Sequence, residues 1–125
     1  MKYVYNKLVR DKITEEINKM KGRKANYKIL NDDDEYLQEL DKKLFEEAHE
    51  FIEEHSVEEL ADLMEVISAI IKLRKISLED VEKAREIKNN KKGKFENKVY
   101  LIDVEQEYTD EREENELKKE WRKNK

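Results

Sequence analysis

The chain contains no cysteine and no proline, and Gly22 and Gly93 are its only glycines. The absence of cysteine excludes disulfides and thiolate metal sites. Without proline, and with so little glycine, long helices are not interrupted by backbone chemistry. No stretch approaches the roughly 20 apolar residues that span a membrane, and the first residues lack the apolar run of a signal peptide. We therefore expect a cytoplasmic protein that does not bind membranes.

Hydrophobic residues make up 37% of the 125 residues and charged residues 47%. Such a composition suits one domain with a thin core, which gains stability by sharing apolar helix faces with a second copy. The net charge of −5 disfavours binding to nucleic acids, whose phosphates need a positive surface. A nucleotide substrate remains compatible with this charge if a metal ion supplies positive charge locally.

Apolar residues recur with helical spacing in four stretches, which predict helices over about residues 8–20, 35–53, 56–75 and 78–89. Capping signals support the starts of the last three: the run Asn31-Asp32-Asp33-Asp34, Ser56 followed by Glu59, and Ser77 followed by Asp80. The third helix is apolar nearly all round, which is typical of a central or interface helix. We expect an all-α, antiparallel helical bundle over residues 1–104, followed by a charged tail over 105–125. Leu117 and Trp121 can hold that tail as a helix.

Two acidic pairs stand at i, i+3 spacing, Glu47 with Glu50 and Glu59 with Asp62. This spacing places both members of a pair on one helix face. The short break between the two helices predicts that they pack antiparallel, so the pairs can face each other. Helical geometry sets Glu47 and Glu59 at or within apolar arcs, whereas Glu46 points to the solvated side.

Carboxylates in a half-buried seam repel one another unless a cation lies between them. Oxygen ligands suit Mg²⁺ or Mn²⁺, and Mg²⁺ commonly binds substrate phosphates. The plainer interpretation also stands: among 32 acidic residues such pairs arise on solvated faces by chance, and Glu59 has the position of a capping-box residue. From spacing alone, both interpretations remain open.

The residues around these pairs resemble the Glu-Glu-x-x-Glu and Glu-x-x-Asp motifs of the MazG-like all-α nucleoside triphosphate pyrophosphohydrolases. The motifs are Lys42-Lys43-Leu44-Phe45-Glu46-Glu47-Ala48-His49-Glu50 and Glu58-Glu59-Leu60-Ala61-Asp62-Leu63-Met64-Glu65-Val66. The opening Tyr5-Asn6-Lys7-Leu8-Val9-Arg10-Asp11-Lys12-Ile13 is similar to that of a house-cleaning subgroup. The likeness covers about residues 3–102. It departs at Lys92-Gly93-Lys94-Phe95, where arginine and a second glycine are usual.

The resemblance implies Mg²⁺-dependent hydrolysis of a nucleoside triphosphate, including non-canonical ones, to a monophosphate and pyrophosphate. It implies a fold completed by assembly into a homodimer or homotetramer. Carried over by position, the catalytic and metal-binding residues are Glu47, Glu50, Glu59 and Asp62. Charge makes five further residues candidates for phosphate contact, with surface ion pairs as the plainer role: Lys7, Arg10, Lys12, Lys43 and Lys92. Lys43 is also placed as an i, i+4 partner of Glu47.

Three alternatives stay open. A phosphoribosyl-ATP pyrophosphohydrolase shares the helical superfamily and similar acidic motifs. A helical oligomerisation module without enzymatic activity accounts for the acidic, thin-cored composition. A nucleic-acid binder could use the lysines between residues 88 and 98, although the net charge disfavours it.

Overall fold

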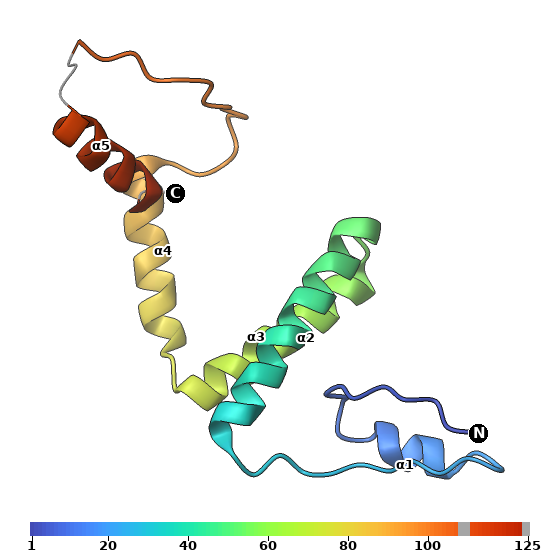
Figure 1. The fold of residues 1–125 in the computed structure, drawn as a ribbon. Coiled ribbons are helices and arrows are strands. Elements are labelled where there is room, and N and C mark those ends of the chain that lie inside the picture. Colours follow the sequence, from blue (N-terminus) through green and yellow to red (C-terminus); the bar gives the residue numbers. More distant parts are fainter. Residues whose placement is uncertain (108–110, 124–125) are drawn as a thin grey trace. The chain divides into compact units, whose positions relative to one another are not determined.

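The computed structural model describes residues 1–107 and 111–123, with the side chains of residues 121 and 123 left out. Within these ranges the chain is all-helical, as predicted, with five helices and no strand (Figure 1). They are α1 (Ile13–Asn18), α2 (Asp33–Glu54), α3 (Val57–Arg74), α4 (Leu78–Lys92) and α5 (Glu111–Lys123). The chain divides into two compact units, Met1–Ile87 and Lys88–Lys125, and each is described here by itself.

Side-chain caps determine where α2 and α3 begin. The Asp32 carboxylate accepts a hydrogen bond from the Asp34 amide at 3.0 Å, and the Ser56 hydroxyl accepts one from the Glu59 amide at 3.2 Å. Both bonds satisfy amides of a first helical turn that have no partner within the helix. Between the two helices, His55 adopts a left-handed conformation with φ of 50°. The chain thus reverses over two residues, His55 and Ser56.

Helices α2 and α3 pack side by side, and they are the one helix pair in close contact within the part of the chain that the structure describes (Figure 1). Leu40 of α2 and Val66 of α3 are buried, with 3% and 9% of their surface exposed. The core of the first unit is therefore thin, as the composition predicts. The buried glutamate Glu47 lies within the same hairpin.

The first helix is shorter than predicted, because residues 8–12 are not helical. Lys12 occupies the N-cap position of α1 without a side-chain capping bond, and Lys19 occupies the C-cap position after the last helical residue, Asn18. Gly22 lies beyond the end of this helix with φ of 77°. The segment before α1 is instead held by ion pairs to α2 and α3, which are described below.

Helix α4 begins where Ser77 caps the Asp80 amide at 3.2 Å and ends before Gly93, whose φ is 84°. The boundary between the two compact units falls inside α4. The predicted division into a domain over residues 1–104 and a tail over 105–125 stays a prediction. The charged tail contains α5, on which Leu117 is half-buried. Trp121, the second residue expected to hold it, has a side chain outside the described part.

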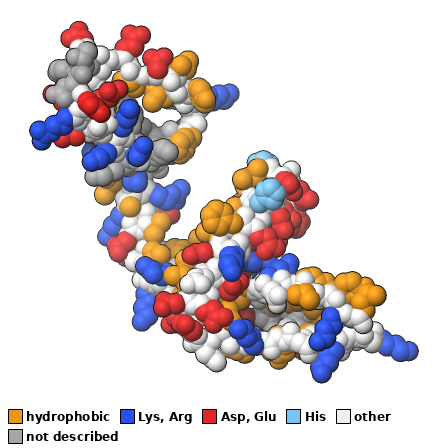
Figure 2. Space-filling model, in the orientation of Figure 1, with side chains coloured by type: hydrophobic (Ala, Val, Ile, Leu, Met, Phe, Trp, Pro, Cys, Tyr) orange, Lys and Arg blue, Asp and Glu red, His pale blue; other side chains and the backbone are white. Residues whose placement is uncertain are grey.

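Many hydrophobic side chains lie on the surface (Figure 2). On α3 they include Leu60, Met64 and Ile67, exposed by 42%, 61% and 39%. Among the described residues, no helix is both long enough and apolar enough to cross a membrane.

Candidate metal centre

Three glutamates of the α2–α3 hairpin form one cluster. Glu47 and Glu50 lie on α2 and Glu59 on α3, and each offers a carboxylate oxygen that lies within 4.8 Å of the others. Glu47 is 7% exposed, and Glu50 and Glu59 are half-buried. Such a group of oxygens at such distances is compatible with a single divalent cation between them.

Local structure explains how the three side chains meet. Glu47 and Glu50 share a face of α2 through their i, i+3 spacing. Glu59 lies in the first turn of α3, which the Ser56 hydroxyl caps through the Glu59 amide. The short turn at His55 brings this first turn back beside the last turns of α2. The backbone amide of Glu59 takes part in the cap, whereas the side-chain carboxylate of Glu59 belongs to the cluster.

The cluster is electrostatically unfavourable without a cation. Burial raises the pKa of Glu47, and the charges of Glu50 and Asp62 raise it further, while Lys43 partly opposes them. Burial also raises the pKa of Glu59, helped by Glu50, Glu54 and Asp62. In both cases loss of hydration is the largest cause of the raised pKa, and the neighbouring negative charges add to it.

Two oxygens of the cluster remain unsatisfied. One carboxylate oxygen of Glu47 and one of Glu59, both Oε2, are buried and have no hydrogen-bond partner. Buried polar atoms normally have a partner, so such atoms call for an explanation. A divalent cation accounts for both, because it satisfies oxygen acceptors and cancels their repulsion. The donor set fits Mg²⁺ or Mn²⁺, which prefer carboxylate oxygens.

Asp62, the fourth predicted ligand, lies next to the cluster but is not one of its three members. Its Oδ1 atom accepts a hydrogen bond from the Arg10 guanidinium at 2.8 Å. The negative charge of Asp62 nevertheless contributes to the raised pKa of Glu47 and of Glu59. Asp62 is therefore near enough to act on the cluster while Arg10 holds one of its oxygens.

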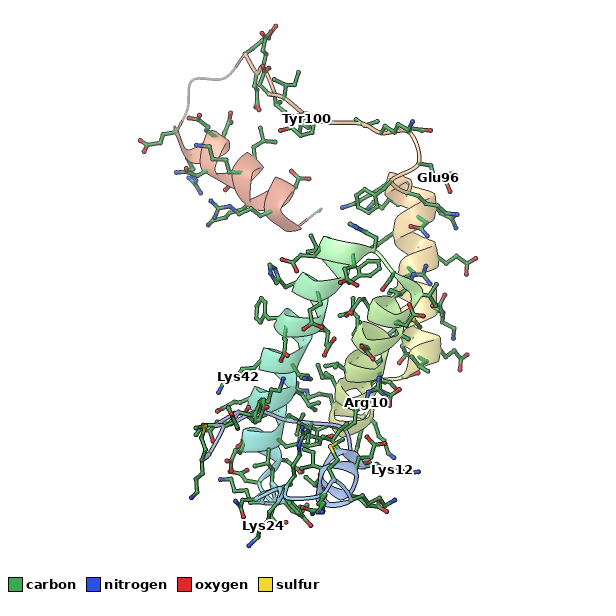
Figure 3. All side chains as sticks on the ribbon, turned by 90° about the vertical axis from the view of Figure 1, so that its right-hand side faces the viewer. Arg10, Lys12, Lys24, Lys42, Glu96 and Tyr100 are labelled. Atoms are coloured by element: carbon green, nitrogen blue, oxygen red, sulfur yellow. The ribbon has the colours of Figure 1, made fainter. Side chains whose placement is uncertain are left out.

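The predicted phosphate-contacting cations lie in four different settings. Lys43 lies 3.6 Å from Glu47 and 3.4 Å from Glu46, which confirms the expected i, i+4 pair. Lys7 lies 3.5 Å from Glu46, so Lys7 and Arg10 attach the N-terminal segment to α2 and α3 respectively. Lys12 is exposed and extends away from the α2–α3 hairpin, whereas Arg10 lies beside that hairpin (Figure 3). Lys92 belongs to the second unit.

Two features of the site were not anticipated from the sequence. Glu46, expected on the solvated side, is paired with Lys7 and Lys43. The ion pair between Arg10 and Asp62 was not predicted either. The Lys7–Glu46 and Arg10–Asp62 pairs join residues far apart in the chain, and no local pattern identifies such partners. The Lys43–Glu46 pair, by contrast, lies within α2 at i, i+3 spacing. Compared with models of protein families, with curated proteins and with solved structures, the chain matches none.

Proposed function

We propose that the protein is a Mg²⁺-dependent nucleoside triphosphate pyrophosphohydrolase of the MazG-like, all-α type. The observation that carries the proposal is the buried carboxylate of Glu47, with one unpartnered oxygen, beside the carboxylates of Glu50 and Glu59. A folded chain retains such a costly arrangement when a cation compensates it. The flanking motifs resemble the same family.

In this proposal Glu47, Glu50, Glu59 and Asp62 hold the metal. A bound divalent cation supplies charge neutralisation for the phosphates and a water of lowered pKa. Glu50 and Glu59, which are half-buried, would supply carboxylate oxygens that accept a proton where the metal does not engage them. Mn²⁺ is expected to replace Mg²⁺, since both ions take carboxylate oxygens.

Positive charge beside the cluster is suited to the triphosphate. Lys43 lies within 3.6 Å of Glu47, and Lys7 and Arg10 approach the same hairpin from the N-terminal segment. Cations so close to a metal site can contact phosphate oxygens while the metal neutralises others. Lys12 and Lys92 remain candidates on charge alone. The products are a nucleoside monophosphate and pyrophosphate, with non-canonical nucleotides as the expected substrates.

The protein also forms a homodimer or homotetramer in this proposal. Four exposed apolar residues of α3 follow a 3-4-3 spacing along one face. They are Val57, Leu60, Met64 and Ile67, with exposed fractions of 80%, 42%, 61% and 39%. This spacing is that of a helix face that packs against another helix. A second copy burying this face compensates the thin core of the single chain.

The decisive experiment is a screen of normal and modified nucleoside triphosphates with Mg²⁺, reading monophosphate and pyrophosphate together. We expect both products in equal amounts, and we expect Glu47→Gln to abolish their release. Phosphoribosyl-ATP belongs in the panel, because turnover of that compound alone would favour the histidine-synthesis enzyme. A protein that hydrolyses none of these compounds would favour the non-enzymatic oligomerisation module.

A further inference from the structure

We propose that Arg10 is an internal counter-ion of Asp62, which a divalent cation must displace before Asp62 completes the metal site. The inference rests on the proposed metal site and adds a competition between a side chain and the ion. Arg10 then becomes free at the moment when the metal is bound, next to the position that the triphosphate occupies.

The geometry around Asp62 supports this competition. The Arg10 guanidinium donates to Asp62 Oδ1 at 2.8 Å, and three neighbouring carboxylates form a group that does not include Asp62. An oxygen that accepts a hydrogen bond from a guanidinium has less capacity to coordinate a metal. A buried, unpartnered oxygen of Glu47 marks where positive charge is still lacking. Arg10 therefore neutralises the rim of the site but not its centre.

The pair is also easily exchanged. The side chains of Arg10 and Asp62 are 59% and 41% exposed, and ion pairs between such groups contribute little because water screens them. The segment that carries Arg10 precedes α1 and is not helical. Two ion pairs attach this segment to the hairpin, this one and the Lys7–Glu46 pair at 3.5 Å. Release of Arg10 thus requires no rearrangement of the packed helices.

Displacement has a measurable consequence for metal affinity. Every binding event in the wild type must first break the Arg10–Asp62 pair, so removal of Arg10 should tighten metal binding. Because the pair is partly exposed, we expect Arg10→Ala to bind Mn²⁺ about two- to fivefold more tightly. Lys7→Ala is the matched control, since it removes a cation of the same segment whose partner, Glu46, is outside the cluster. Its effect should be smaller.

The test is isothermal titration of the full-length, metal-free chain with Mn²⁺, without nucleotide. A double-mutant cycle separates competition for Asp62 from a general effect of charge. In an Asp62→Asn background, Arg10→Ala should no longer change the affinity. Circular dichroism of each variant verifies that the helices are intact.

Unchanged or weaker Mn²⁺ binding by Arg10→Ala would overturn the inference, as would a gain that persists with Asp62→Asn. Hydrolysis by the wild type distinguishes this failure from failure of the proposed function. If the wild type releases pyrophosphate but Arg10→Ala gains no affinity, the function stands and the competition does not exist. If neither protein binds Mn²⁺ and no triphosphate is hydrolysed, both proposals are overturned.

Discussion

Glu47 of α2 and Glu59 of α3 hold carboxylate oxygens within 4.8 Å of each other, and the Oε2 atom of each residue is buried without a hydrogen-bond partner. Neither helix by itself brings these charges together. The hairpin does so, and it places Glu50 in the same group. The first unit therefore gathers several carboxylates in a poorly hydrated site, which opposes their ionisation.

Divalent metal should stabilise the folded chain, because an ion that binds only the folded state raises the free energy of unfolding. At a Mg²⁺ or Mn²⁺ concentration of 100 times the dissociation constant, the gain is about 2.7 kcal/mol. We expect the melting temperature to rise by several degrees, as followed by circular dichroism at 222 nm. Glu47→Gln should lose this response and melt no lower than the metal-free wild type. An equal rise in both proteins would place the metal elsewhere.

The metal-free protein should lose stability as the pH rises above the usual carboxyl pKa of 4.5. Burial and neighbouring charges raise the pKa of Glu47 and Glu59. Over that window the folded state holds more protons than the unfolded state, so the contribution of these groups falls as they ionise. Urea unfolding at a series of pH values measures this loss. The free energy of unfolding of Glu47→Gln should increase relative to that of the wild type as the pH rises. Parallel curves for the two proteins would contradict the raised pKa of Glu47.

Metal affinity should show the opposite trend over the same window. The ligands must be ionised to coordinate a cation, so binding releases protons and strengthens as the pH rises. Titration with Mn²⁺ from pH 5 upward should therefore give tighter binding until both glutamates are ionised. An affinity independent of pH would indicate that these carboxylates are already charged in the metal-free protein.

Glu46 and Glu50 provide a matched pair for assigning the site. Glu50 belongs to the cluster, whereas Glu46 is paired with Lys7 and Lys43. We expect Glu50→Gln to lower the hydrolysis rate by at least about tenfold, and Glu46→Gln to lower it much less. Pyrophosphate release at saturating Mg²⁺ measures both. If the two variants lose activity equally, the distinction between these neighbours is wrong.

The apolar face of α3 should mediate self-association. Met64 is 61% exposed in the single chain, and burying a methionine side chain contributes about 1.5–3 kcal/mol. Met64→Glu should therefore weaken the dimer by at least about tenfold. Sedimentation equilibrium measures the change, with Glu65→Gln, an exposed neighbour on the same helix, as control. A wild-type chain that remains monomeric at high concentration would refute this assembly.

The sequence by itself predicted where α2 and α3 begin, because capping residues close to each start determine these limits. Asp32 and Ser56 cap α2 and α3 as expected, because a capping bond joins residues within one turn. The i, i+3 spacing of Glu47 and Glu50 likewise follows from the helix repeat alone. These are local properties of the backbone, so no tertiary information was needed.

The tertiary structure decided which carboxylates meet and which cations hold the others. It joined Glu59 to the α2 pair, and it gave Asp62 to Arg10 and Glu46 to Lys7. It also kept residues 8–12 out of α1, where the sequence predicted a helix. These contacts depend on how distant segments pack, so local spacing does not identify them. The Lys43–Glu47 pair was predictable because its residues are four apart on one helix. The limits of α2 and α3 therefore follow from local sequence, whereas packing determines which charges pair between distant segments of the chain.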